Sequence, residues 1–440
     1  MRAQVNSANA VTHRKKEGYV TMNEIRPSNG RWFNRNVFAF GLTSFLSDFC
    51  HEMATSVLPQ FMQTIGASAA ALGFIEGVAD ALSSFVKLGA GYHSDKIGHR
   101  KKWTVVGYIL TAISKAVFAF AFAWPLILLA RSVGWLGRGI RGPLRDAMLA
   151  ESVSQQDRGK AFGFHRAGDT AGAVAGPLAA FGLLSWIAGH PGMIETLGRW
   201  FPSLAGAPGG DFRVIFLLTL VPGILSVISI LIVREKRRAP NNGMHLMETI
   251  RAMPKDYRQF LVAVGVFGMA DFAPTLMILR ATTVMESHMG LIEASRLAAL
   301  FYLLRNILYT VASYPIGALS DRFRRPRYLA VGYGVAVLTF MGFAFVVSSV
   351  WWFIVFFSLA GIFIAWEDTI EVIAVRDYVD ESIAGTAYGL LGVVNGVGDF
   401  AASVVVGLLW TAVGPSWGFG YAAVVGLLGT VLMAKAPSMK

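Results

Sequence analysis

Long apolar runs separated by short polar links follow one another along the 440 residues of the chain. A helix needs roughly 20 apolar residues to cross a membrane, and runs of about that length recur throughout the sequence. They occupy residues 37–62, 69–91, 103–123, 125–147, 161–187, 213–233, 259–280, 295–317, 328–348, 351–374, 384–410 and 417–434. This pattern predicts an all-α polytopic membrane protein with about twelve spanning helices.

The composition supports this prediction. Hydrophobic residues make up 54% of the chain and charged residues only 15%, which is too apolar for an ordinary soluble protein. The chain also holds 47 glycines, many of them inside the apolar runs. Frequent glycine favours closely packed helices in lipid over the strands of a barrel.

The net charge of +12 is concentrated in the links on one side of the predicted membrane. Residues 1–35 carry seven Lys and Arg and residues 92–102 carry four, whereas the opposite links 63–68, 349–350 and 411–416 carry none. The positive-inside rule therefore places both termini in the cytoplasm. Because topology explains the basic charge, we expect no nucleic-acid partner.

The longest polar interruption, residues 234–258, separates six predicted spans from six. It is basic and contains two prolines, which is typical of a linker between domains. A second interruption, residues 188–212, is rich in Gly and Pro and is expected to form a loop on the opposite side. The predicted domains are a tail (1–35), a first six-helix half (36–233), a linker (234–258), a second six-helix half (259–434) and a tail (435–440).

The two halves contain matching segments. The stretch GYHSDKIGHRKK at 91–102 matches GALSDRFRRPR at 317–327, and SDF at 47–49 is echoed by ADF at 270–272. An internal repeat of this kind is a sign of a duplicated architecture. The echoes predict two pseudo-symmetric halves, as in transporters with parallel repeats.

The loop pattern, its weaker second copy and the six-plus-six arrangement resemble the major facilitator superfamily. The resemblance implies that the loop residues govern gating. An acid beyond a helix end, followed by a turn and basic residues, can pair with a basic residue or a helix N-terminus of a neighbouring element. Such an interaction needs little free energy to break, so it can differ between two conformations. The expected gating residues are Gly91, Asp95, Lys96, Gly98, Arg100, Gly317, Asp321, Arg322 and Arg325.

The predicted fifth span contains Gly172, Gly176 and Pro177, which resemble the core of the superfamily's antiporter motif. The resemblance implies a packing role for these residues and exchange of two solutes. The chain departs from the motif after the proline, where it has leucine and alanine in place of the usual glycines.

Ionised groups occur inside the apolar runs. Asp48, His51 and Glu52 are spaced i, i+3 and i+4, so they share one face of the first span. A charged residue at the centre of a membrane costs about 2.5–3.5 kcal/mol on insertion scales, and we therefore expect these groups to face a cavity or a partner.

The resemblance implies that the first, fourth, seventh and tenth spans line a central cavity. The residues expected to bind substrate or protons are therefore Asp48, His51, Glu52, Arg138, Asp271, Glu367 and Glu371. A carboxylate in such a cavity can gain and lose a proton as the cavity opens to either side. The remaining charges are expected to form a network in which acids neutralise arginines: Glu76, Asp80, Arg131, Arg141, Arg166, Asp169 and Asp399.

These features predict a secondary transporter that exports a small solute by proton antiport and alternating access. We expect a monomer in the cytoplasmic (inner) membrane whose partners are a small molecule or ion, protons and the lipid bilayer. No enzymatic activity and no cofactor are expected, because the sequence has no phosphate-binding Gly loop and no nucleophile motif.

Three other functions remain open. Asp48, His51 and Glu52 offer carboxylate and imidazole ligands that suit a divalent-metal or metal-complex carrier. Arg138 and Arg141 would suit an organic-anion carrier. The same fold could also form a membrane sensor that transports nothing.

Overall fold

The computed structural model describes residues 32–97, 99–235, 250–251, 253–345, 350–379 and 383–437. Most of the predicted linker 234–258, most of the tail 1–35 and Gly98 lie outside these ranges. The side chains of Asp95, Lys96 and Asp321 and the surroundings of Gly91 also lie outside the described part, although the backbone there is placed. All regular structure within the described residues is helical.

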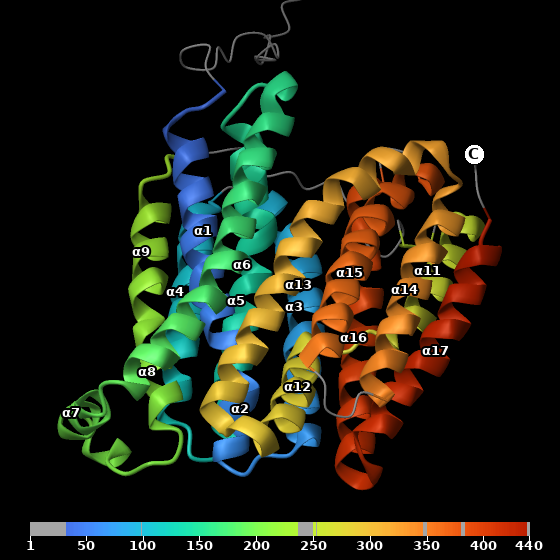
Figure 1. Cartoon of the computed structure of the whole chain (residues 1–440). Coiled ribbons are helices and arrows are strands. Elements are labelled where there is room, and N and C mark those ends of the chain that lie inside the picture. The colour runs from blue at the N-terminus through green and yellow to red at the C-terminus, as the bar shows by residue number, and fades with distance from the viewer. Residues whose placement is uncertain are drawn as a thin grey trace, which may run out of the picture. The chain divides into compact units, whose positions relative to one another are not determined.

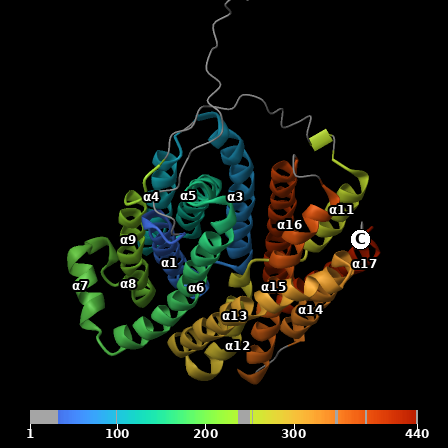
Figure 2. The same cartoon turned by 90° about the horizontal axis from the view of Figure 1, so that it is seen from above.

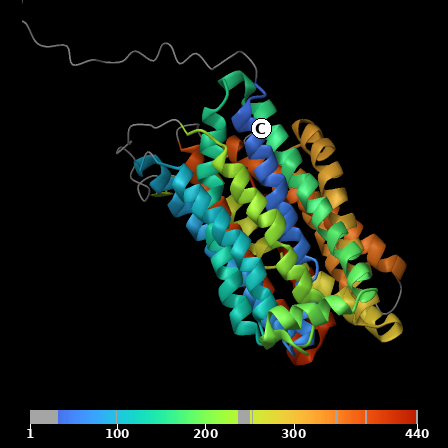
Figure 3. The same cartoon turned by 90° about the vertical axis from the view of Figure 1, so that its left-hand side faces the viewer.

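The first half is built from helices that alternate in direction (Figure 1). Asn34 starts the first helix by accepting hydrogen bonds from the N–H groups of Asn36 and Val37, at 2.9 and 3.1 Å, which is a standard N-cap. The helices are α1 (Arg35–Thr55), α2 (Leu58–Thr64), α3 (Ala69–Ile97), α4 (Lys101–Val117), α5 (Trp124–Glu151), α6 (Arg158–Ala188), α7 (Gly192–Trp200), α8 (Gly210–Leu218) and α9 (Leu220–Leu231). Helices α8 and α9 run along the outer side of this half (Figure 3).

The second half repeats this order. Its core is rich in phenylalanine; the rings of Phe343 and Phe357, for example, meet edge to face with centroids 5.4 Å apart. The helices are α11 (Lys255–Gly268), α12 (Pro274–Met289), α13 (Leu291–Leu319), α14 (Arg325–Phe345), α15 (Val350–Tyr378), α16 (Ala384–Val413) and α17 (Pro415–Lys435).

Nine helical segments in the described part of the chain are long and apolar enough to cross a membrane. The remaining predicted spans correspond to α1, α5 and the pair α11–α12. Helix α1 carries Asp48 and Glu52, α5 carries four arginines, and α11 and α12 are each short. Together these helices account for all twelve predicted spans, and the predicted all-α fold with two six-helix halves is confirmed.

Two of the predicted spans are not continuous helices. The first is interrupted after Thr55, and Pro59 lies in the first turn of the helix that follows. The seventh is interrupted after Gly268, and Pro274 begins the next helix. Proline has no N–H and disfavours a helical conformation in the residue before it, so each helix restarts instead of continuing. The prediction of unbroken helices was therefore wrong at equivalent places in both halves.

The prediction of a loop at 188–212 was also wrong in part. This segment contains α7 and a short 3₁₀ turn at Pro202–Leu204. Helix α7 buries Leu197 and exposes Glu195 and Arg199, so it is amphipathic.

The halves meet mainly through two pairs of helices, α3 with α16 and α6 with α13, while α12 adds contacts with α2 and α3. Seen from above, α3 and α16 lie between the two groups of helices (Figure 2). Glycines bring α3 and α16 very close, since a Cβ added to Gly73 would lie 2.0 Å from the Ser403 carbonyl oxygen. A Cβ added to Gly407 would lie 2.6 Å from the Ala69 carbonyl oxygen.

We call the side on which α1 begins and α17 ends the basic side, and the other the non-basic side (Figure 1). Hydrogen bonds join the halves at the non-basic side. Gln60 and Gln63 of α2 donate to Thr282 and Thr283 of α12, each at 3.2 Å. The two interrupted spans therefore touch each other across the interface.

Candidate functional site

The first span carries an ionised group that is paired with an arginine of α5. An Asp48 carboxylate oxygen lies 3.5 Å from an Arg138 guanidinium nitrogen. The Arg138 side chain is 32% exposed and the Asp48 side chain 11%. The Arg138 side chain is therefore the more accessible member of this pair.

Asp169 of α6 adds a second carboxylate beside this pair. It accepts a short hydrogen bond from the Ser44 hydroxyl of α1, and its carboxylate lies 3.8 Å from the guanidinium of Arg166. Asp169 interacts electrostatically with both Asp48 and Arg138. We call Asp48, Arg138, Arg166 and Asp169 the Asp48 cluster; it draws residues from three helices.

Glycines of α6 allow this cluster to form. A Cβ added to Gly172 would lie 2.4 Å from the Phe45 carbonyl oxygen and 3.1 Å from the Asp48 Cβ. A Cβ added to Gly176 would lie 2.7 Å from the Glu52 Cβ. Small residues let helix backbones approach closely in a membrane, so the predicted packing motif lies directly behind the acidic face of α1.

His51 and Glu52 do not join Asp48 in one site. The His51 ring packs on Trp135 with centroids 4.6 Å apart, and Glu52 interacts with Tyr302 of α13. Among the described residues, no group of three or more His, Cys, Asp and Glu side chains could hold a metal ion. The trio shares a helix face, but its members turn to three different neighbours, and the predicted metal site is not assembled.

The other charges of α3 and α5 form a separate, buried arrangement. Arg131 donates from Nε and Nη2 to one Glu76 carboxylate oxygen, at 3.0 and 2.6 Å, and from Nη1 to Thr55 at 3.3 Å. The Trp135 indole donates to Asp80 at 2.6 Å. These contacts tie α3 to α5 within the first half.

Arg141 points away from the Asp48 cluster. Its guanidinium lies over the ring of Tyr108, 4.1 Å from the centroid, and the residue is 2% exposed. Of the two arginines proposed for an organic anion, only Arg138 is accessible.

The second half gathers four carboxyl groups around the interruption between α11 and α12. Asp271 lies in this interruption and interacts electrostatically with Glu367 of α15. Glu371 accepts hydrogen bonds from Tyr333 and, at 2.7 Å, from Asn395. We call Asp271, Glu367, Glu371 and Asp399 the acid cluster. Asp399 of α16 interacts electrostatically with Asp271 and with Asp80 of the first half.

Polar side chains of α6, α13 and α15 bridge the two halves nearer the basic side. Arg166 of α6 donates a short hydrogen bond to the Tyr309 hydroxyl of α13, which in turn donates to Asp368 of α15 at 2.7 Å. Asn306 of α13 also donates to the Ala173 carbonyl of α6 at 3.0 Å. We call Arg166, Tyr309 and Asp368 the inter-half bridge.

The arginines of the two loop motifs make equivalent ion pairs. Arg100 pairs with Glu151 at the end of α5, and Arg325 pairs with Asp377 near the end of α15. The number of residues between Glu151 and Asp377 is nearly the same as the number between Arg100 and Arg325, so the two pairs occupy equivalent positions in the two halves. Arg322 is exposed, and a Cβ added to Gly317 would lie 3.2 Å from a Thr369 methyl group.

Several residues of these sites were not identified from the sequence. Tyr309, Tyr333 and Asn395 are uncharged, so they give no signal within an apolar run. Glu151 and Asp377 lie at the ends of spans and resemble ordinary link residues. Their matching offset was the signal that could have revealed them.

Comparison with known proteins places the chain in a family. The sequence profile of the Major Facilitator Superfamily matches residues 40–304 and 259–438. A protein of Methanocaldococcus jannaschii described as an uncharacterised MFS-type transporter is 31% identical over 408 residues, covering 92% of this chain and 96% of its own. The quinolone resistance protein NorA of Staphylococcus aureus is 22% identical over 389 residues, covering 86% of this chain and 90% of its own.

Solved structures agree at the level of the fold. The crystal structure of the nucleoside transporter NupG superposes with a TM-score of 0.72 at 14% identity, covering 91% of this chain and 99% of its own. The repeat, the helices and the sequence matches thus lead to one conclusion: the chain belongs to the major facilitator superfamily and is a multi-pass membrane transporter of that type.

Proposed function

We propose that this transporter exports a small solute across the cytoplasmic membrane in exchange for protons. It works as a monomer without a cofactor, and its basic side faces the cytoplasm. The observation that carries this proposal is the pair of buried, interacting carboxyl groups of Asp271 and Glu367 inside the membrane. Two ionised carboxylates repel each other, so a shared proton stabilises such a pair.

The Asp48 cluster supports proton coupling from the first half. Arg138 pairs with Asp48 and has Asp169 close by. When Asp48 takes up a proton, the attraction that holds Arg138 is lost, because a neutral carboxyl group no longer pairs with a guanidinium. Protonation therefore releases an accessible cation into the space between the helices.

Alternating access gives the inter-half contacts a role. The bonds from Gln60 and Gln63 close the non-basic side, and the inter-half bridge crosses nearer the basic side. Each set must break in turn for a central site to open to one side and then to the other. The loop pairs Arg100–Glu151 and Arg325–Asp377 hold the basic-side helix ends together within each half.

Export is favoured by one distant relative. NorA is described as a quinolone resistance protein, and removal of a drug from the cell is one way to give resistance. The solute itself is not specified by this similarity.

The proposal is tested in inside-out membrane vesicles that are acidified by respiration and monitored with a pH-sensitive dye. Organic cations, zwitterions, organic anions and divalent metals are added in turn. A substrate of the parent protein should release protons from the vesicles, and Asp271→Asn should abolish this release.

Glu293→Gln is the matched control, since Glu293 is an exposed acid that pairs with Arg296 far from the cluster. This control should behave like the parent. Substrate movement that continues after the pH gradient is collapsed, with no change in vesicle pH, would refute proton antiport.

An organic-anion carrier remains the second candidate because Arg138 and Arg166 are both accessible, at 32% and 63% side-chain exposure. An anionic substrate should then lose binding in Arg138→Ala, while Arg141→Lys should bind it nearly as well as the parent. Equal anion binding by Arg138→Ala and the parent would exclude this version.

A further inference from the structure

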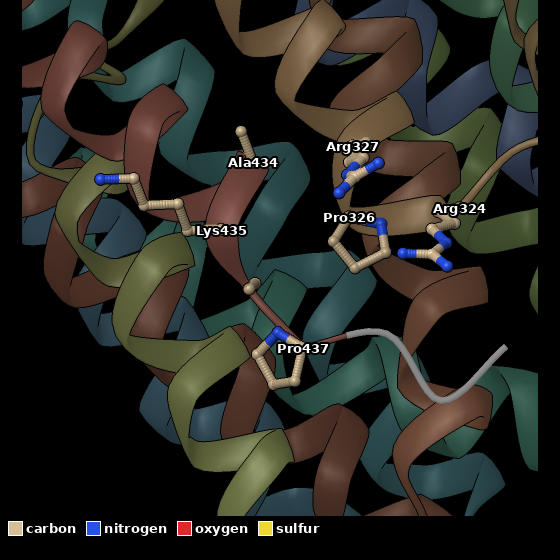
Figure 4. A pocket seen from close by; sticks show the side chains of 7 residues that line it. Arg324, Pro326, Arg327, Ala434, Lys435 and Pro437 are labelled. Carbon is tan, nitrogen blue, oxygen red and sulfur yellow. The ribbon is translucent and has the colours of Figure 1, made fainter.

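A pocket lined by basic side chains lies at the basic side of the second half, away from both clusters described above. It opens between the start of α14 and the end of α17 (Figure 4). Its volume is about 340 Å³, and its basic lining residues are Arg324, Arg327 and Lys435, of which the Lys435 ammonium points away from the two arginines (Figure 4). The Tyr378 hydroxyl donates to the Pro437 carbonyl at 2.6 Å, which holds the chain after α17 in place as one wall.

The equivalent place in the first half is occupied by a carboxylate. There, Glu235 follows α9, the last span of that half, and accepts hydrogen bonds from the N–H groups of Arg100 and Lys101 at the start of α4. The start of α4 corresponds to the start of α14, and the end of α9 to the end of α17. The first half therefore neutralises this helix start with its own acid.

Among the described residues, none that lines the pocket of the second half is acidic. These lining residues are Arg324, Pro326, Arg327, Ala434, Lys435, Ala436 and Pro437. Within the described residues, the side chains of Arg324, Arg327 and Lys435 make no hydrogen bond or ion pair, whereas the side chain of the neighbouring Arg325 is paired with Asp377. Three unneutralised cations around a pocket attract an anion.

Apolar surface continues from the pocket toward the membrane interior. Val431 and Leu432, one turn before Lys435 on α17, are 43% and 42% exposed, and Leu428 is 56% exposed. Phe323, beside Arg324, is 56% exposed. A ligand with a charged head and long apolar chains fits this combination, because its head would meet the cations while its chains lie along α17.

We propose that this pocket binds the phosphate group of an anionic phospholipid. Arginine matches phosphate oxygens in a bidentate geometry, and basic pockets between helices at the cytoplasmic face are known to hold lipid head groups. The lipid supplies from outside the negative charge that Glu235 supplies in the first half. Placement in the cytoplasmic leaflet rests on the orientation given under Proposed function, but binding itself does not.

The test is native mass spectrometry of the purified full chain titrated with phosphatidylglycerol, phosphatidylcholine or inorganic phosphate. The variants are Arg324→Gln with Arg327→Gln, and Lys435→Glu. The control is Lys160→Gln, which removes an exposed cation that pairs with Asp157 on the same side. Melting midpoints recorded without lipid establish that each variant is folded.

We expect the parent and the control to bind phosphatidylglycerol in preference to phosphatidylcholine. Binding should weaken by about fivefold for each basic side chain removed, and Lys435→Glu should weaken it further by placing a carboxylate in the pocket. Equal binding of the two lipids by the parent, or unchanged binding by both variants, would overturn the proposal. Inorganic phosphate that binds as tightly as phosphatidylglycerol would also overturn it, because the site would then recognise a soluble anion.

Discussion

Arginines of one helix, α5, occupy three different environments. Arg131 is buried and paired with Glu76, Arg138 is accessible beside Asp48, and Arg141 is buried against Tyr108. The sequence predicted that acids of neighbouring spans would neutralise such arginines. The organic-anion alternative nevertheless grouped Arg138 with Arg141, because the environment of each depends on which neighbouring helix its side chain meets.

At this scale we predict that Glu76→Gln destabilises the protein. The change leaves the guanidinium of Arg131 buried with a neutral partner, and breaking a buried pair from one side costs about 3–5 kcal/mol. The measurement is the unfolding free energy in mild detergent, supported by the melting midpoint.

The matched comparison is the double variant Glu76→Leu with Arg131→Met. Replacing both charges by apolar groups removes the unpaired charge, so this variant should be much more stable than Glu76→Gln. If the free energy of unfolding of Glu76→Gln equals that of the parent, the ion pair between Glu76 and Arg131 does not stabilise the fold.

Elements were predicted well where a span is a plain apolar helix, because hydropathy alone identifies such segments. The interruptions at Pro59 and Pro274 were missed, since both prolines lie inside long apolar runs that continue on either side. The proline was the available signal in each case. Helix α7 was missed because its segment is bounded by Gly and Pro, which resemble loop residues.

The packing of α6 on α1 gives a prediction at the scale of elements. Gly172→Ala should destabilise the protein, because the new Cβ would lie 2.4 Å from the backbone of α1 and force the helices apart. Overpacking of this kind costs about 1–3 kcal/mol. The melting midpoint should fall, and the affinity for any substrate that depends on Asp48 should fall with it.

Gly182→Ala is the matched control on the same helix, since a Cβ added there would meet nothing within 4 Å. It should be as stable as the parent or more so, because alanine favours a helix over glycine. Equal stability of Gly172→Ala and Gly182→Ala would show that α6 can move away from α1 without cost.

The architecture of the whole molecule followed from the internal repeat. Matching loop motifs predicted two related halves, and the equivalent pairs Arg100–Glu151 and Arg325–Asp377 reflect that relation. The inter-half bridge could not be predicted in this way. It joins α6 to α13 and α15, which are distant in sequence, and its central residue, Tyr309, has no charge.

We predict that Tyr309→Phe shifts the balance between the conformations of the transporter. The change removes hydrogen bonds with two charged groups, Arg166 and Asp368, and such bonds contribute about 1.5–3 kcal/mol each. The population with α6 and α13 separated at the basic side should therefore rise about tenfold or more.

Spin labels at Lys160→Cys and Tyr314→Cys would measure this separation, since both positions are exposed. Cys50, the only cysteine of the chain, is first replaced by serine. Asp368→Asn should cause a smaller shift, because its amide oxygen still accepts from Tyr309. Identical distance distributions for Tyr309→Phe and the parent would contradict the role of the bridge.

The contact between α3 and α16 also determines whether the transporter changes conformation abruptly or gradually. At Gly73 and Gly407 the helices meet backbone to backbone, with no flexible side chain between them to absorb a small displacement. A close-packed contact of this kind is either made or lost, because interfaces are bistable and do not deform continuously. Single molecules watched across this interface should therefore dwell at two distances and cross between them abruptly, with almost no time spent at intermediate values.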